Sequence, residues 1–200
     1  MMTILYEVEK KLYVNITNKC GCACVFCIRK NDDGVYGSDS LWLEREPNLD
    51  EIIEEFEKRD LNKYDEIVFC GYGEPLERLE LIIYICEYLK KINTPKIRIN
   101  TNGLADLIYN DDVAEKLKGL VDIISISLNA GTAETYLKIT NSSYGEKSFE
   151  ALLKFAEDCK KYIPKVIFTL VDVISKEEIE IAKKISENMD IELRIRAYEK

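Results

Sequence analysis

The order of apolar patterns along the chain restricts its fold most, because segments typical of strands alternate with segments typical of helices. Six short runs are rich in β-branched and apolar residues, which favours strands. We expect these strands at Leu12–Thr17, Glu66–Cys70, Lys96–Asn100, Ile123–Leu128, Lys165–Val171 and Ile191–Arg196. Strict alternation predicts parallel strands joined by right-handed helical crossovers, and therefore an α/β fold.

Between these strands, apolar residues recur at the three- and four-residue spacing of amphipathic helices. We expect helices at Leu49–Phe56, Leu79–Leu89, Val113–Leu120, Phe149–Tyr162 and Ile179–Met189. Asp50 and Ser175 are the expected N-caps, and Glu178, three positions after Ser175, predicts a capping box. Six strand–helix units account for the 200 residues, so we expect one domain over residues 1–200.

The charge balance limits the classes of partner. The chain has 28 basic and 37 acidic residues and a formal net charge of −9. Such a surface repels phosphate backbones, so we expect no direct nucleic-acid binding. The longest uncharged apolar run, Leu81–Cys86, is far shorter than the ~20 residues that span a bilayer. The first ten residues lack the apolar stretch of a signal peptide, and we expect no membrane association and a cytoplasmic location.

The composition excludes several catalytic classes. The chain has no histidine, so it cannot form a Ser-His-Asp triad, a Cys-His dyad or an imidazole metal site. It has seven cysteines, and four of them lie between residues 20 and 27. A secreted disulfide framework would spread its cysteines, so this cluster predicts a metal or redox site in a reducing compartment. Cys70, Cys86 and Cys159 lie in apolar contexts and are expected as small core residues.

The spacing within the cluster favours an iron–sulfur site. Cys20, Cys24 and Cys27 form C-x3-C-x2-C, so one loop offers three thiolates to a [4Fe–4S] cluster and leaves one iron open. The alternatives are a four-thiolate zinc site that adds Cys22, and a redox dithiol of Cys24 and Cys27. Zinc sites normally use two separated cysteine pairs, and a dithiol does not need Cys20, so we favour iron–sulfur over both. We interpret Cys22 as a bystander thiol rather than a spare ligand or a reactive group.

Unusual residues gather where the expected strands end. The first strand leads into the cysteine cluster, and the second ends in Gly71-Tyr-Gly-Glu-Pro75. The next three strands end in Asn100-Thr-Asn-Gly103, Ser127-Leu-Asn129 and Asp172-Val173. The carboxyl ends of parallel strands meet at one edge of an α/β fold, where ligands bind. We therefore expect one site on this rim.

These motifs resemble those of the radical S-adenosylmethionine (SAM) superfamily. The cysteine spacing, with Phe26 just before the last cysteine, is similar to the superfamily signature. Gly71-Tyr-Gly-Glu-Pro75 is similar to its GGEP motif, with Tyr72 in place of a glycine. The resemblance covers essentially the whole chain and implies a (β/α)6 partial TIM barrel with parallel strands. In overall sequence and size, the chain most resembles the small radical SAM proteins associated with TatD-type deoxyribonucleases.

The resemblance implies a role for each candidate residue. Cys20, Cys24 and Cys27 would bind three irons, and the amino and carboxylate groups of SAM would chelate the fourth. Gly73 and Glu74 would meet the amino group, mainly through their backbone. The other implied contacts of SAM are Phe26 against the adenine, Val173 at the adenine edge, and Asn100, Asn102, Ser127 and Asn129 around the carboxylate and ribose.

The implied activity is reductive cleavage of SAM to a 5′-deoxyadenosyl radical, which abstracts hydrogen from an unidentified substrate. An external one-electron donor of the flavodoxin or ferredoxin type would reduce the cluster. Oxygen destroys such exposed clusters, so we expect an anaerobic setting. Because the strand–helix units use the chain, we expect a macromolecular substrate or partner to close the barrel, with the irregular Arg29–Pro47 stretch as a partial lid. An association with a TatD-type nuclease is also implied.

Two other functions stay open on the sequence. One is an activating enzyme of the glycyl-radical type, which acts on a partner protein and falls within the same resemblance. The other is a non-catalytic cysteine-rich module that binds zinc and a partner. Metal content separates the zinc-binding module from both enzyme hypotheses, because an iron–sulfur protein is brown and a zinc protein is colourless.

Overall fold

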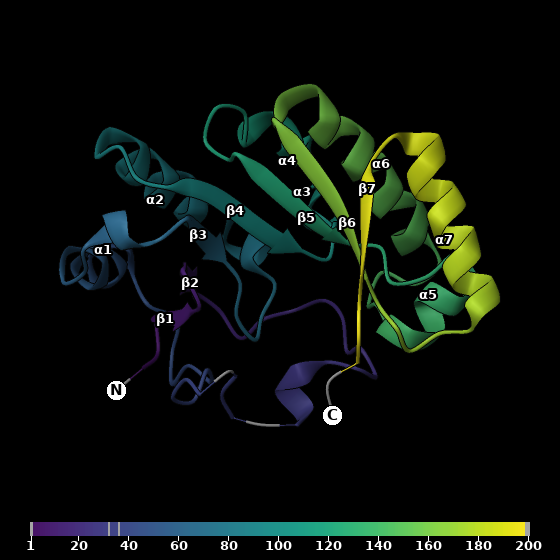
Figure 1. Ribbon diagram of the computed structural model, residues 1–200, viewed down its shortest axis with the longest axis horizontal. Coiled ribbons are helices and arrows are strands. Elements are labelled where there is room, and N and C mark those ends of the chain that lie inside the picture. Colours follow the sequence, from purple (N-terminus) through teal and green to yellow (C-terminus); the bar gives the residue numbers. More distant parts are fainter. Residues whose placement is uncertain (1, 32, 36, 199–200) are drawn as a thin grey trace.

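The computed structural model describes residues 2–31, 33–35 and 37–198, and its centre is one seven-stranded sheet (Figure 1). The strands follow one another across the sheet in chain order, from β1 to β7. Strands β2 to β7 pair in parallel, and β1 pairs antiparallel with β2. The strands are β1 Leu5–Val8, β2 Lys11–Val14, β3 Glu66–Phe69, β4 Lys96–Thr101, β5 Ile123–Ser127, β6 Lys165–Val171 and β7 Glu192–Arg196.

Helical segments connect each parallel strand to the next. The α-helices are α1 Leu49–Glu57, α2 Leu79–Lys91, α3 Ala105–Tyr109, α4 Val113–Lys116, α5 Ala133–Thr140, α6 Lys147–Tyr162 and α7 Lys176–Met189. Three 3-10 helices complete the set: η1 Ile28–Lys30, η2 Leu61–Lys63 and η3 Pro75–Arg78. The predicted α/β partial barrel of parallel strands is confirmed. None of the helices in the described part of the chain is long and apolar enough to cross a membrane.

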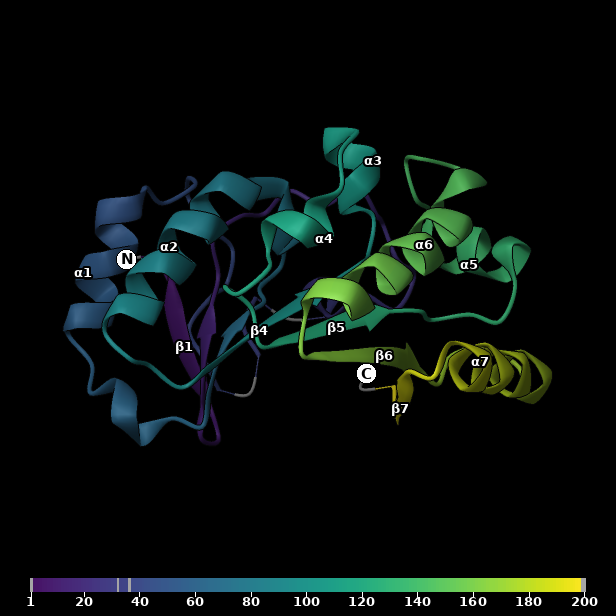
Figure 2. The same cartoon turned by 90° about the horizontal axis from the view of Figure 1, so that it is seen from above.

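The helices cover one face of the sheet and leave the other face to the site. Figure 2 shows α2, α4 and α6 on the same side of β4 and β5. In β4, Ile97 and Ile99 are fully buried and belong to the core that these helices share. Side chains alternate along a strand, so Arg98 and Asn100 face the opposite, concave side, where they line a cavity.

Strand β1 and helix α5 were not expected from the sequence, and neither were the short helix α3 and the three 3-10 helices. Strand β1 joins β2 through a two-residue turn at Glu9 and Lys10, and Glu9 has a φ of 54°. Asparagine and glycine are the usual residues in such turns, so the hairpin lacked its sequence signal. Helix α5 contains Thr135, Tyr136 and Ile139, whose side chains lower helix propensity. Both β1 and α5 are short, and both depend on contacts with distant segments.

Helix boundaries differ from the expected ones where capping residues decide them. Asn48, and not Asp50, is the N-cap of α1, and it forms a reciprocal capping box with Glu51. Ser175 is confirmed as the N-cap of α7, but Glu178 does not complete a capping box. Its carboxylate instead accepts hydrogen bonds from the loop after β5. Helix α4 ends at Lys116, short of the expected boundary.

Candidate functional site

The cysteine cluster lies in the loop between β2 and η1, at the carboxyl end of β2. Two backbone amides of this loop donate to the last carbonyls of α5. The distances are 2.9 Å from Ala23 N to Thr140 O and 2.8 Å from Val25 N to Ile139 O. The last four carbonyls of a helix lack donors within the helix. The cysteine loop therefore completes the end of α5, and α5 in turn fixes the backbone of the loop.

The Gly71–Pro75 loop, at the carboxyl end of β3, packs directly against the start of the cysteine loop. The Glu74 amide donates to Lys19 O at 2.7 Å. A Cβ atom at Gly73 would lie 2.4 Å from Thr17 O and 2.6 Å from Lys19 O, closer than any side chain tolerates. Glycine is thus required for this approach, and the two sequence motifs are joined through their backbones immediately before the first cysteine.

The carboxylate of Glu74 is buried and holds the loop in place. It accepts hydrogen bonds from Leu76 N at 3.1 Å, Thr101 Oγ1 at 2.7 Å and Asn102 N at 2.7 Å. Burial raises the pKa of Glu74 to about 7, and the three hydrogen bonds oppose this shift. Both the amide and the carboxylate of Glu74 have protein partners. Its part in the site is therefore to position the loop between the ends of β3 and β4.

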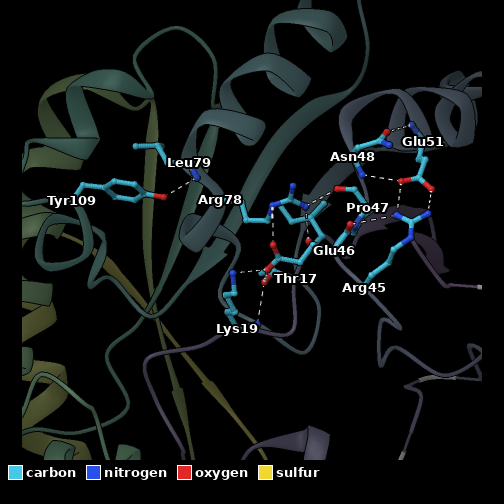
Figure 3. Close-up of polar contacts among 11 residues, drawn as sticks. Thr17, Lys19, Arg45, Glu46, Pro47, Asn48, Glu51, Arg78, Leu79 and Tyr109 are labelled. Carbon is cyan, nitrogen blue, oxygen red and sulfur yellow. Dashed lines mark hydrogen bonds and ion pairs between the residues drawn. The ribbon is translucent and has the colours of Figure 1, made fainter.

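A network of side chains braces the same loops from outside (Figure 3). Arg78, the last residue of η3, donates to Ile16 O at 3.0 Å and to Pro47 O at 2.7 Å. Its Nε atom lies 3.8 Å from the carboxylate of Glu46. Glu46 also accepts a hydrogen bond from Thr17 Oγ1 at 2.8 Å. Three segments far apart in sequence are thus joined at the end of β2.

The segment between η1 and α1 is tethered to the end of β2. Asn15 donates to Leu41 O at 2.8 Å, and Asn18 exchanges two hydrogen bonds with the backbone of Leu43, at 2.8 and 3.1 Å. Between them, Trp42 is 41% exposed and packs edge-on against Tyr72, with ring centroids 5.1 Å apart. This part of the expected lid is therefore held beside the site. Positions 32 and 36 of the same stretch lie outside the described residues.

A cavity of about 210 Å³ lies between these loops and the carboxyl ends of the strands. Ten of the eleven residues that the sequence assigned to the cluster and SAM line it. They are Cys20, Cys24, Phe26, Cys27, Gly73, Glu74, Asn100, Asn102, Ser127 and Asn129. The parallel register of β3, β4 and β5 brings these strand ends to one rim. Figure 1 shows the chain between β2 and η1 passing below this rim toward the end of β7.

Val173 is the predicted residue that does not line this cavity. It is half-buried and lies two residues beyond β6, where its amide donates to Val171 O at 2.8 Å. Val171 itself lines a neighbouring cavity together with Phe26 and Arg196. At the end of β6, the structure therefore places Val171, rather than Val173, in a common cavity wall with Phe26.

Sequence reasoning missed several residues of the cavity wall. Cys70, expected in the core, is half-buried and lines the cavity, whereas Cys86 and Cys159 are buried as expected. Tyr136 was missed because it belongs to the unexpected helix α5. Thr169 lies on β6 and faces the concave side. A polar residue within an otherwise apolar strand is the signal that identifies such positions.

The donor set fits an iron–sulfur cluster. Cys20, Cys24 and Cys27 line the same cavity, and cysteine thiolates are the usual ligands of such clusters. Within the described residues, no three Cys, Asp or Glu side chains converge so that they could hold one metal ion. In a cubane cluster each thiolate binds a different iron. The three cysteines of the predicted ligand set thus share one cavity, as a cluster requires.

The thiol of Cys22 lies between those of Cys20 and Cys24 and shares hydrogen bonds with both. The hydrogen bond with Cys22 and burial raise the pKa of Cys20. The hydrogen bond with Cys20 lowers the pKa of Cys22. The hydrogen bond with Cys24 and burial together raise it by more, so that the pKa of Cys22 is raised to about 12. Cys22 is only 5% exposed and packs in the main core. Cys22 also lines the cavity beside the three predicted ligands, and its interpretation as a bystander thiol stays a prediction.

A cysteine-lined cavity at the carboxyl rim of a parallel partial barrel defines an α/β protein built to hold an iron–sulfur cofactor. The family model of the radical SAM superfamily matches residues 14–185. The chain therefore belongs to the radical SAM superfamily, a family of enzymes that use a [4Fe–4S] cluster and SAM.

Its relatives include proteins named as cyclases. A probable GTP 3′,8-cyclase of Saccharolobus islandicus is 30% identical over 183 residues, which are 90% of this chain and 54% of that protein. A probable GTP 3′,8-cyclase of Methanocaldococcus jannaschii is 30% identical over 149 residues, which are 72% of this chain and 45% of that protein. The chain thus spans about half the length of these relatives.

Solved structures share the fold at low sequence identity. SuiB of Streptococcus suis bound to S-adenosylmethionine is 16% identical with a TM-score of 0.68, over 96% of this chain and 41% of that one. A radical SAM methyltransferase of Sphaerobacter thermophilus is 17% identical with a TM-score of 0.62, over 96% of this chain and 57% of that one. At this identity, the similarity supports the partial-barrel fold.

The close approach at Gly73 leads to a prediction. Gly73→Ala places a methyl group against backbone oxygens, so we expect the unfolding free energy to fall by about 1–3 kcal/mol, and SAM binding to weaken. Chemical denaturation and calorimetric SAM titration measure the two effects. Gly21→Ala is the control, because its methyl group would meet only side-chain atoms, at 3.0 Å or more. Equal denaturation midpoints for both variants would contradict the packing argument.

Proposed function

We propose that this chain cleaves SAM reductively at a cluster bound by Cys20, Cys24 and Cys27, and that it abstracts hydrogen from a substrate. The observation that carries the proposal is the shared cavity: three cysteines of one loop and the Gly73 loop of another strand line the same space. When bound, the cluster and SAM supply one-electron cleavage of the sulfonium and a hydrogen-abstracting radical. Membership of the radical SAM superfamily supports this activity.

The chain's own residues would bind and orient SAM. Gly73 keeps its loop against the cysteine loop, so its backbone lies at the cavity wall. The side-chain oxygen of Asn102 accepts a hydrogen bond from Leu104 N at 2.9 Å. This bond orients the side chain so that its amide nitrogen lies 3.9 Å from the sulfur of Cys22, on the cavity side. Ser127 and Asn129 offer further polar groups for the carboxylate and ribose.

Aromatic side chains bound the cavity and would exclude water. Phe26 lies on the cysteine loop and is the proposed neighbour of the adenine, with Val171 in the same wall of the adjoining cavity. The sequence-based assignment of Val173 to the adenine edge stays a prediction. Tyr136 is only 1% exposed and lines the cavity from α5. A radical reaction requires such exclusion, because solvent and solutes would quench the reactive species.

SAM cleavage tests the proposal directly. Protein with a reconstituted cluster, reduced under anaerobic conditions, is expected to form 5′-deoxyadenosine slowly from SAM even without substrate. Chromatography measures the product, and Cys24→Ala is the control. If the wild-type protein carries a full cluster but forms no more 5′-deoxyadenosine than this control, the proposed activity is wrong. Iron without zinc in the purified protein would also exclude the zinc-binding module.

The substrate and the subfamily are further proposals. The names of the relatives suggest GTP as a candidate substrate, which can be added to the same assay. The resemblance to TatD-associated radical SAM proteins rests on overall sequence and size. It suggests association with a TatD-type nuclease, which co-purification of the two proteins from the native organism would test.

A protein partner is favoured by the exposed apolar side chains near the cysteine loop. Val25 is 54% exposed and Ile28 is 37% exposed, both within or directly after the cluster. Large apolar side chains that stay exposed in a group are typical of interaction sites. We propose that an electron donor of the flavodoxin or ferredoxin type, or a protein substrate as in glycyl-radical activation, contacts this loop. Candidate partner proteins that accelerate 5′-deoxyadenosine formation in the same assay would support a protein contact at this loop.

A further inference from the structure

A second cavity, of about 650 Å³, lies on the concave face of the sheet. It shares four residues with the cavity proposed for SAM: Asn100, Ser125, Thr169 and Arg196. The two spaces therefore adjoin each other along β4, β5, β6 and β7. A molecule held in the second cavity would lie beside the cofactor, where hydrogen abstraction takes place.

Three of the seven arginines of the chain line this second cavity. Arg98 comes from β4, and Arg194 and Arg196 come from β7. Alternate residues of a strand face the same side, so Arg194 and Arg196 share one face of β7. The register pairs Arg194 with Thr169 on β6. None of the described lining residues is a lysine, and the chain as a whole carries a net charge of −9. The arginines are thus concentrated at this face.

Arg98 has hydrogen-bonding capacity that the described chain does not use. Its side chain is 11% exposed, and one guanidinium nitrogen lies 3.2 Å from the carboxylate of Glu66. Its Nε atom is buried and has no hydrogen-bond partner. A guanidinium carries five N–H donors, and a buried donor without a partner destabilises the folded chain. Oε2 of Glu66 is likewise buried without a hydrogen-bond partner. A bound group that accepts a hydrogen bond from Arg98 Nε would satisfy this donor.

Two of the three arginines have a carboxylate partner, Arg98 in Glu66 and Arg194 in Glu192. Glu192 accepts a hydrogen bond from Arg194 Nε at 2.7 Å. Glu7 and Glu9 line the cavity from the β1–β2 hairpin, and Glu7 already accepts a hydrogen bond of 2.6 Å from a tyrosine hydroxyl. Within the described chain, no ion pair joins Arg196 to a carboxylate. Arg196 lines both cavities, so its guanidinium is the one available to a ligand where they meet.

We propose that the second cavity binds a negatively charged group of the substrate, a carboxylate or a phosphate, through Arg98, Arg194 and Arg196. The planar guanidinium group matches either anion with two parallel hydrogen bonds. The neutral polar side chains shared by both cavities would then face the rest of the substrate. This assignment rests on the proposed function, because it places the substrate of the SAM-cleaving site.

Calorimetric titration of the cluster-containing protein, under anaerobic conditions, tests the site without any turnover. The probes are inorganic pyrophosphate for the phosphate class and succinate for the carboxylate class. We expect saturable binding of at least one probe, and about tenfold weaker binding by Arg196→Gln, as for loss of one charged hydrogen-bonded pair. Arg98→Gln is expected to have a similar effect. Arg98→Gln also leaves Glu66 without its ion-pair partner, which can lower stability. Arg196 is exposed, so Arg196→Gln tests the site without this effect on the core.

Arg59→Gln is the matched control, because Arg59 lies just beyond α1, pairs with Glu55 of that helix at 2.9 Å and does not line the cavity. Its affinity for the probes is expected to equal that of the wild type. Tighter binding of pyrophosphate would indicate that the substrate's anionic group is a phosphate, and tighter binding of succinate would indicate a carboxylate. Either result supports the site. No saturable binding, or equal affinities of wild type and Arg196→Gln, would overturn it. Absence of SAM cleavage would instead overturn the proposed function and leave this titration valid.

Discussion

Replacement of Cys20, Cys24 or Cys27 by alanine is expected to abolish cluster binding. Each variant removes one of three thiolates, and the chain has no histidine that could replace it. Iron and sulfide per chain should fall to background after anaerobic reconstitution, and the brown colour should be lost. SAM cleavage should disappear with the cluster. This is the largest effect that we expect from any single substitution.

Two buried cysteines provide the matched controls for this experiment. Cys22→Ala is expected to keep iron near the wild-type level, because Cys22 packs in the core and lies outside the superfamily spacing. Cys86→Ala, in α2, tests the general cost of removing a buried thiol. Iron loss from Cys22→Ala as complete as that from Cys24→Ala would show that the ligand set is misassigned.

Glu74→Ala is expected to have the second largest effect, on both stability and SAM binding. The substitution leaves Leu76 N, Thr101 Oγ1 and Asn102 N without their buried acceptor. Each unpaired buried group costs about 1–3 kcal/mol, so we expect the unfolding free energy to fall by roughly 3 kcal/mol or more. The loop that carries Gly73 should lose its fixed position. Denaturant unfolding followed by circular dichroism, and calorimetric SAM titration, measure the two losses.

Glu77→Ala is the control for this prediction. Glu77 lies in η3, the 3-10 helix that Glu74 caps, and is only partly buried. Its removal takes away the same charge without a network of buried hydrogen bonds. If Glu74→Ala and Glu77→Ala unfold at the same denaturant concentration and bind SAM equally, Glu74 does not position the loop.

The sequence predicted those parts of the fold that local patterns specify. The parallel strands β2 to β7 were expected because each is a short apolar run, and their carboxyl ends were expected to carry the site. The antiparallel strand β1 was missed because its turn contains Glu9, which is unusual at a positive φ. Helix α5 was missed because its residues favour other structures, and only contacts with the cysteine loop reveal why it forms.

Residues of the site were predictable where they belong to an uncommon sequence motif. They were less predictable where their role depends on hydrogen bonds to distant residues. The cysteines and the Gly71–Pro75 loop are recognisable in the sequence. The function of the Glu74 carboxylate is not, because its partners Thr101 and Asn102 are far away along the chain. The same holds for Arg78, which contacts Ile16 and Pro47. Hydrogen bonds between distant segments leave no local pattern that could be read beforehand.

The attachment of the cysteine loop to α5 has a consequence for the reducing power of the site. Hydrogen bonds to the sulfur atoms are among the factors that set the reduction potential of an iron–sulfur cluster, since they stabilise its added negative charge. The amides of Ala23 and Val25, which flank Cys24, donate to carbonyls of α5 instead. The end of a helix also carries partial negative charge. A cluster held on this loop would receive no hydrogen bond from these two amides, which would favour the low potential that one-electron cleavage of a sulfonium demands.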